Sequence, residues 1–245
     1  MNQYNLNQTT RTIGYSPQSR ALSNETFSTL LRNVYIWMSL ALSITALSAL
    51  WIVSSDFALN LFLGSSTSLL ILIIAQLGLA LALSWGLNRM SFPIASILFA
   101  AYSFLTGITC SSVFLIYTTE SIVSTFFVTA GTFAGMSLYG YFTKKDLSNW
   151  GQYLIMGLIG IIIASLVNLF MKSEMVMWIT TYIGVILFVG LTAYETQKIK
   201  NMLSNISSNE LNDSSMKLAL LGSFILYLDF INLFLKLIRI LGKRK

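Results

Sequence analysis

Residues 69–87 read LLILIIAQLGLALALSWGL, a run without a single charged side chain. A helix needs about 20 predominantly apolar residues to cross a hydrocarbon core about 30 Å thick, so this run predicts a membrane-spanning helix. Lipid offers no partner for an unpaired backbone group, and such a span must therefore be helical. Together with six similar runs, it predicts an all-α integral membrane protein with seven transmembrane helices, at residues 34–53, 69–87, 93–117, 122–142, 153–171, 175–197 and 218–238.

The composition supports this fold class and excludes several kinds of chemistry. Of the 245 residues, 55% are hydrophobic and only 10% are charged, which is too little charge to cover a soluble domain. The chain has no histidine, so zinc, haem and Ser-His-Asp chemistry lose their main ligand or base. We therefore expect no enzyme activity, no cofactor and no nucleic-acid partner. The domains are expected as a disordered polar tail at 1–25, one transmembrane domain at 26–240 and a basic tail at 241–245.

The distribution of Lys and Arg predicts the orientation, because cytoplasmic loops carry an excess of positive charge. Seven spans place the basic tail, residues 243–245, on the opposite side from the N-terminus. The alternative, in which the last run is re-entrant and the tail returns inside, stays open at this point. The N-terminus is expected to be cytoplasmic because most cations share its side: Arg11, Arg20, Arg32, Arg89, Lys144, Lys145, Lys198, Lys200 and Lys217.

Two of the nine acidic residues lie inside predicted helices. Asp229 lies well inside the last helix, and Glu195 lies near the end of the sixth. A charge at the bilayer centre costs about 2.5–3.5 kcal/mol on insertion scales, so such residues indicate a functional site. For Glu195 the alternative is a side chain that extends to the interface, and for Asp229 it is a structural hydrogen bond.

The last helix carries a polar stripe, which predicts that it lies at the centre of the bundle with the other six around it. At about 100° per residue, the members of the stripe fall close to one line, and polar groups in a membrane face the bundle interior. The sixth helix has small residues on the side of Glu195, so the two carboxylates could meet. The stripe consists of Ser215, Gly222, Asp229 and Lys236, flanked by Asn232 and Arg239.

A carboxylate pair in a low-dielectric site titrates as a unit and can act as a proton switch without any histidine. The same oxygens could serve a cation. Calcium takes 6–8 oxygen ligands, so Glu195 and Asp229, with Asn232 as a supporting polar group, are too few for a tight cage. They suit a weak, transient Ca²⁺ site in a leak pathway, where protons and Ca²⁺ compete.

The stretch GLTAYETQKIK at residues 190–200 resembles the signature of the Bax inhibitor-1 family, also called the transmembrane Bax inhibitor motif family. The stretch LYLDFINLFL at 226–235 resembles the last helix of that family. Further matches run in order through the membrane part, and the resemblance is strongest to the bacterial inner-membrane (YbhL-like) branch. They are LTGIT at 105–109, MSLYGY at 136–141 and ASLVN at 164–168.

The resemblance implies a bacterial inner-membrane protein whose last helix is enclosed by the other six. It also implies a pH-sensitive calcium leak channel, controlled by a carboxylate pair at the positions of Glu195 and Asp229. An arginine near the end of the second helix holds the path closed in this family, and Arg89 is the candidate here, with a positive-inside anchor as the alternative. The family usually has Asp where this chain has Glu195, so a shifted pH response is expected.

Two other functions stay open. Bacterial members of the family are linked to membrane proteases of the quality-control type, so this chain could modulate such a protease. A cation/proton exchanger is the other alternative. The GxxxG pattern of Gly131 and Gly135 predicts close helix packing, within the bundle or between protomers, and we expect a monomer rather than a dimer.

Overall fold

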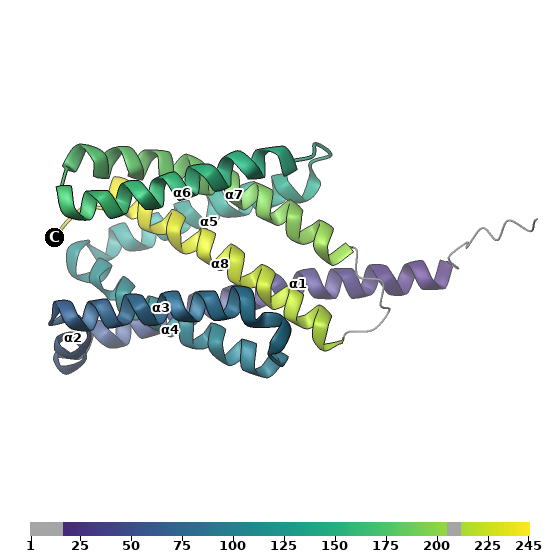
Figure 1. The fold of residues 1–245 in the computed structure, drawn as a ribbon, viewed down its shortest axis with the longest axis horizontal. Coiled ribbons are helices and arrows are strands. Elements are labelled where there is room, and N and C mark those ends of the chain that lie inside the picture. Colours follow the sequence, from purple (N-terminus) through teal and green to yellow (C-terminus); the bar gives the residue numbers. More distant parts are fainter. Residues whose placement is uncertain (1–16, 205–211) are drawn as a thin grey trace, which may run out of the picture.

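The structure, a computed structural model, describes residues 17–204 and 212–245, with side chains from residue 25 onward except that of Asn88. Seven of its helices are long and apolar enough to cross a membrane, which confirms the predicted spans (Figure 1). Most of the predicted polar tail lies outside the described residues. The helices are α1 (Pro17–Val53), α2 (Asp56–Leu63), α3 (Ser66–Gly86), α4 (Phe92–Ile116), α5 (Thr119–Phe142), α6 (Ser148–Met171), α7 (Glu174–Ser204) and α8 (Asp213–Leu241), with a 3₁₀ turn, η1 (Leu87–Arg89).

The helix α2 was not among the predicted elements. It has 8 residues, far fewer than a span needs, and joins α1 to α3 at one end of the bundle. Ser55 precedes it in an extended conformation, and its side chain accepts a hydrogen bond from the backbone N–H of Ala58. This is an ordinary N-cap, because a hydroxyl satisfies one of the unpaired N–H groups of the first turn.

The two ends of the described chain lie at opposite ends of the bundle. The described part of α1 begins at the same end as the start of α8, whereas the C-terminal residues lie beside the connection between α4 and α5 (Figure 1). The last helix is continuous over 29 residues. The re-entrant alternative for the last run therefore does not hold, and the basic tail lies opposite the start of α1.

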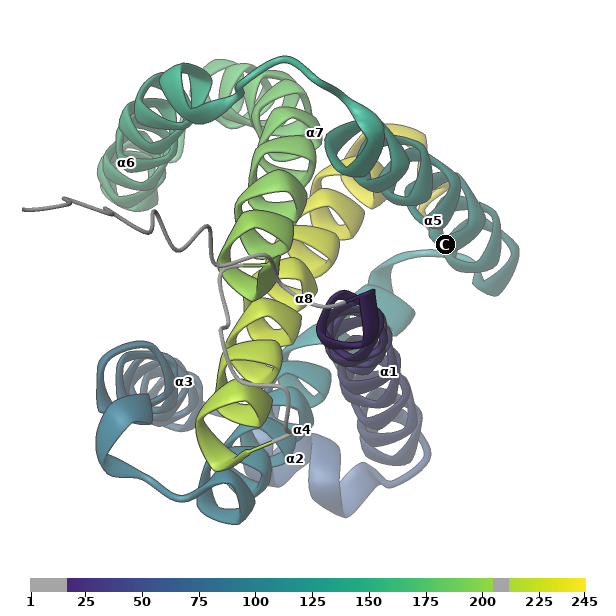
Figure 2. The same ribbon diagram turned by 90° about the vertical axis from the view of Figure 1, so that its right-hand side faces the viewer.

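Helix α8 is the most buried of the seven candidate spans. In its most apolar window 56% of the residues are buried, against 44% in α4 and 6% in α6. It packs directly on α1, α4, α5 and α7, while α6 lies behind α7 at the edge of the bundle (Figure 2). Enclosure of α8 by all six other spans remains a prediction.

The contact of α8 with α1 and α4 is aromatic and contains a buried hydrogen-bonded network. Phe99 of α4 meets Phe224 and Tyr227 of α8 edge to face, with ring centroids 5.5 and 5.6 Å apart. The Tyr227 hydroxyl lies 2.7 Å from the Thr45 hydroxyl of α1. Thr45 also hydrogen-bonds the carbonyl of Ser103 on α4. A hydrogen bond between helices satisfies polar groups that lipid cannot, so this contact fixes the three helices together.

Glycine lets helix backbones approach closely at two positions that the GxxxG pattern did not identify. A Cβ atom at Gly107 would overlap the Ser48 side chain and the Thr45 carbonyl of α1, and one at Gly140 would overlap the Ala193 carbonyl of α7. At Gly131 and Gly135 an added Cβ would meet nothing within 4 Å. The prediction that these two glycines pack within the bundle is therefore wrong, because they face outward. Their role between protomers remains a prediction.

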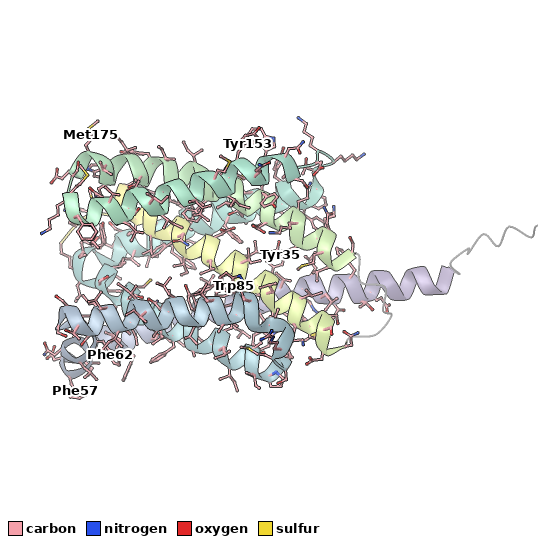
Figure 3. The ribbon with its side chains drawn as sticks, in the orientation of Figure 1. Tyr35, Phe57, Phe62, Trp85, Tyr153 and Met175 are labelled. Atoms are coloured by element: carbon pink, nitrogen blue, oxygen red, sulfur yellow. The ribbon has the colours of Figure 1, made fainter. Side chains whose placement is uncertain are left out.

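The outer surface is apolar, as a surface in contact with lipid must be. Trp85 of α3 and Tyr153 of α6 are 80% and 73% exposed. Tyr153 and Met175 point away from the bundle along the edge formed by α6 and α7 (Figure 3). The two least buried spans, α3 and α6, thus present most of their surface to the bilayer.

Candidate intramembrane carboxylate site

Glu195 lies well inside α7 because that helix is longer than predicted. The expected span ended at residue 197, whereas α7 continues to Ser204 and includes Lys198 and Lys200. Ile199 and Leu203 are each 2% exposed and belong to the main core cluster, so an i, i+4 apolar pair holds the extension against the bundle. Glu195 is therefore at a depth where it can approach the last helix.

Three contacts set the antiparallel register of α7 and α8. A Cβ at Gly222 would lie 3.1 Å from Ile199, and one at Gly184 would lie 3.0 Å from the Lys236 side chain. At the far end, Arg239 donates a hydrogen bond of 3.3 Å to the Thr181 hydroxyl. The predicted polar stripe of α8 thus faces α7. In this register, Glu195 and Asp229 lie roughly one turn apart along the same interface.

The two carboxylates lie close enough to interact electrostatically. Glu195 is 8% exposed and Asp229 is 6% exposed. The Asp229 Oδ2 atom is buried and has no hydrogen-bond partner among the described residues. An unsatisfied carboxylate oxygen in a protein interior costs about 1–3 kcal/mol or more. The structure therefore brings the predicted pair together and leaves one of its oxygens available.

Lys198 is the cation next to the pair, and the sequence analysis did not assign it this position. Its Nζ atom lies 3.2 Å from Glu195 Oε2 and donates a 3.5 Å hydrogen bond to Oε1. The Lys198 side chain is 49% exposed, so solvent screening limits the strength of this ion pair. The i, i+3 spacing from Glu195 on one helix face was the signal in the sequence, but the predicted helix ended before it.

Arg89 and Asn232 do not join the pair in this structure. Arg89 is exposed at the end of η1, and within the described residues neither of the two ion pairs involves it. Asn232 donates a 2.8 Å hydrogen bond to the Leu228 carbonyl of its own helix. It lines a separate cavity of about 370 Å³ between α3, α4 and α8. The roles of Arg89 as a gate partner and of Asn232 as a supporting group remain predictions.

Polar groups from three helices lie between the carboxylates and the end of the bundle where α8 begins. The Thr196 hydroxyl of α7 donates a 3.4 Å hydrogen bond to the Ser137 hydroxyl of α5. Tyr35 of α1 is within hydrogen-bonding reach of both. No group of three or more His, Cys, Asp or Glu side chains forms a metal cluster in residues 17–204 and 212–245. Glu195 and Asp229 are thus the carboxylates that could hold a cation here.

The other half of the α7–α8 interface is closed by two cationic side chains. The stem of Lys236 covers Gly184, and Arg239 is hydrogen-bonded to Thr181. Long basic side chains bury their stems against apolar surface and keep the charged end toward the interface. Lys236 and Arg239 therefore lie along the α7–α8 interface between the carboxylates and the end of the bundle where the C-terminal tail lies.

Gln197 joins α7 to the connection between α5 and α6. Its Oε1 atom accepts a 2.8 Å hydrogen bond from the backbone N–H of Leu147, and its Nε2 atom donates one of 2.8 Å to the Lys145 carbonyl. In the same connection, hydrogen bonds from the side chain and backbone of Ser148 lower the pKa of Asp146. The connection between α5 and α6 is therefore anchored to α7 at Gln197, two residues from Glu195 in the sequence.

Replacing Gln197 by leucine is expected to lower the stability of the full-length protein by about 1–3 kcal/mol, because two backbone groups lose their partners. Hydrogen–deuterium exchange should become faster at residues 143–147, and the midpoint of thermal unfolding should fall. Gln152→Leu is the matched control, because Gln152 is exposed on α6. Equal behaviour of the two variants would show that the contact does not hold the connection.

The chain matches the family described as "Inhibitor of apoptosis-promoting Bax1" over residues 27–245. The chain belongs to the Bax inhibitor-1 family. It is 51% identical to the inner membrane protein YbhL of Escherichia coli K12, over 89% of this chain and 92% of that protein. It is also 46% identical to a Borreliella burgdorferi protein and 45% identical to the Rickettsia prowazekii protein RP147, with 92% and 94% of those proteins covered.

Membership in the Bax inhibitor-1 family agrees with the multi-pass membrane architecture described above. The carboxylate at position 195 belongs to a glutamate, whose side chain is one methylene longer than that of an aspartate. The longer arm reaches along its own helix to Lys198, so the glutamate of this family member is held by an ion pair. A carboxylate with a shorter arm has less reach toward a side chain one turn away.

Proposed function

We propose that this protein is a pH-sensitive calcium leak channel in which the carboxylate pair of Glu195 and Asp229 controls cation passage. The observation that carries the proposal is the Asp229 carboxylate. It is buried within the bundle beside a second carboxylate, and one of its oxygens has no hydrogen-bond partner among the described residues. A buried carboxylate becomes stable when it binds a proton or a cation. A neutral Ser or Asn would have sufficed for helix packing alone.

Protons and Ca²⁺ would compete for the same oxygens. Two like charges in a low-dielectric site share a proton readily, so the pair titrates as a unit. When the pair shares one proton, Lys198 is released and the pair keeps one negative charge and its unprotonated oxygens for a cation. Because Ca²⁺ prefers 6–8 oxygen ligands, the site suits brief passage rather than tight binding.

The Lys198–Glu195 ion pair supports the interpretation of this conformation as closed. The ammonium group lies 3.2 Å from Glu195 Oε2 and over the ring of Tyr194, so it occupies the solvent-facing approach to the carboxylate. Protonation of Glu195 removes the charge that holds Lys198. Acidification therefore releases Lys198 and lets cations reach the two carboxylates from the end of the bundle where α8 begins.

We also propose that the end of the bundle where α1 and α8 begin is cytoplasmic, because cytoplasmic loops carry an excess of positive charge. Among the described residues, the cations at the end where α1 begins include Arg32, Arg89, Lys144, Lys145 and Lys217. The relative YbhL is named as an inner membrane protein, which supports the same compartment for this chain.

Calcium entry into dye-loaded proteoliposomes between pH 5 and 8 tests the proposed function. The expected result is entry above that of empty liposomes, slowest at pH 8. Reversal of calcium movement by an imposed proton gradient would favour the exchanger instead. If the protein shows neither calcium entry nor its reversal at any pH, it is not a calcium channel. Co-purification of a membrane protease with the full chain, but not with a chain lacking residues 1–25, would then favour the protease modulator.

Replacing Lys198 by methionine is expected to raise calcium entry at pH 8 several-fold, because Glu195 loses its counter-charge while the apolar stem is kept. The effect should shrink toward pH 5, where the wild-type ion pair is already released. Lys144→Met, an exposed cation at the same end, is the matched control. Slower entry in Lys198→Met than in the wild type would mean that Lys198 attracts rather than excludes.

A further inference from the structure

An apolar groove opens on the side of the bundle between α1 and α5. Helix α1 packs on α4 and α8, whereas α5 packs on α7 and α8. Between α1 and α5, on the surface of α8, this leaves a space of about 440 Å³. Figure 2 shows α1 and α5 on the same side of α8. The wall is almost entirely apolar, and it includes Ala46 and Ala49 of α1, Phe114 of α4, Phe126 of α5, and Phe230 and Phe234 of α8.

The C-terminal tail lies at the outer mouth of this groove and is fixed there by backbone hydrogen bonds. The N–H of Thr118 donates to the Lys243 carbonyl, and the N–H of Lys245 donates to the Ile116 carbonyl, both at 3.0 Å. The N–H of Lys243 donates to the Ser121 hydroxyl at 3.0 Å. A short antiparallel bridge between Tyr117 and Arg244 results. The tail is thus an ordered part of the bundle rather than a free extension.

This tail places three exposed cations beside the groove. Lys243, Arg244 and Lys245 are exposed, and within the described part of the chain none of them forms an ion pair. The Lys245 Nζ atom donates a 2.8 Å hydrogen bond to the carbonyl of Phe114, which is itself a wall residue. The positive charge therefore stands directly at the end of the apolar space.

We propose that this groove and tail form a binding site for an anionic phospholipid. An acyl chain occupies the groove, and the phosphate of the headgroup lies against Lys243, Arg244 and Lys245. The ligand must carry a long apolar chain and an anionic head, because the site joins an apolar wall within the span to unpaired cations at its end. The site also accounts for a basic tail on the face opposite the start of α1, where positive charge is otherwise scarce.

Native mass spectrometry of the full-length protein with an equal mixture of phosphatidylglycerol and phosphatidylcholine, matched in acyl chains, tests this site. The wild type should retain phosphatidylglycerol preferentially. The triple variant Lys243→Gln, Arg244→Gln and Lys245→Gln keeps the backbone hydrogen bonds of the tail and should lose about tenfold or more of this preference. Lys144→Gln with Lys145→Gln, at the other end of the bundle, is the control and should bind as the wild type does.

A second pair of variants separates the groove from the charge. Ala46 is an exposed wall residue, so Ala46→Trp should fill the groove and reduce retention of both lipids without disturbing the core. Leu47→Trp is the matched control, because Leu47 is 67% exposed and does not line the groove. Equal retention of the two lipids by the wild type, or full retention by Ala46→Trp, would overturn the proposal. If the wild type is a dimer and Ala46→Trp makes it a monomer, a second copy of the chain occupies the groove. That result would also overturn the lipid proposal.

Discussion

Replacing Asp229 by asparagine is expected to reduce calcium entry to the slow level of the wild type at pH 8 and to abolish its pH dependence between pH 5 and 8. Without the neighbouring charge, protonation of Glu195 is less favoured, so its ion pair with Lys198 persists to lower pH. The remaining single carboxylate also attracts Ca²⁺ less strongly. We expect at least a tenfold reduction at the optimum pH, equivalent to about 1.4 kcal/mol.

Two controls accompany this variant. Glu120→Gln removes the same formal charge from an exposed position on α5 and should leave entry unchanged. Asp229→Glu keeps the carboxylate and should retain pH-dependent entry. If Asp229→Asn and the wild type conduct alike, Asp229 is a structural residue and the pH dependence originates elsewhere.

Replacing Gly107 by valine is expected to destabilise the bundle by about 3 kcal/mol, because the new side chain would overlap α1 at Ser48 and at the Thr45 carbonyl. The Thr45 carbonyl is backbone and cannot rotate away, so α1 and α4 must separate. Thr45 joins α1 to Ser103 of α4 and to Tyr227 of α8, so this separation would also strain both of its hydrogen bonds. The effect should be a large fall in the midpoint of thermal unfolding in detergent.

Gly131→Val is the matched control for this experiment, since an added Cβ there meets nothing within 4 Å. It introduces the same β-branched residue into a span and should leave the unfolding midpoint nearly unchanged. A comparable fall in both variants would mean that the helix propensity of valine, rather than the close contact of α1 and α4, determines the loss.

The spans were predictable because membrane insertion depends on length and apolarity, and both are local properties of the sequence. The polar stripe on the last helix was equally local, and the structure turns it toward α7 as expected. The end of α7 was not predictable in this way. The segment after residue 197 contains Lys198 and Lys200, so hydropathy ends the span there, while the buried pair Ile199 and Leu203 continues the helix.

The close packing positions show a second limit of sequence reasoning. The GxxxG pattern identified Gly131 and Gly135, yet the close contacts involve Gly107 and Gly140. A small residue permits close approach, but which face meets a neighbour depends on the arrangement of all the helices. The same dependence explains the groove between α1 and α5, which no local pattern indicates.

The carboxylate site was predictable in its two acidic members but not in its cation. Asp229 and Glu195 are unusual within apolar spans, and that alone identified them. Lys198 was assigned to a loop as a topology-determining charge, and only the extended α7 brings it to Glu195. Arg89, chosen by resemblance, is exposed in this structure.

Infrared difference spectroscopy of the full-length protein in membranes, titrated from pH 8 to pH 5, tests most directly whether the two carboxylates share a proton. If the two share a proton, one protonated carboxyl band grows in as the pH falls, Ca²⁺ suppresses it, and Asp229→Asn and Glu195→Gln each abolish it. A band that persists in both variants, or the absence of any carboxyl titration in this range, would show that the two carboxylates do not share a proton.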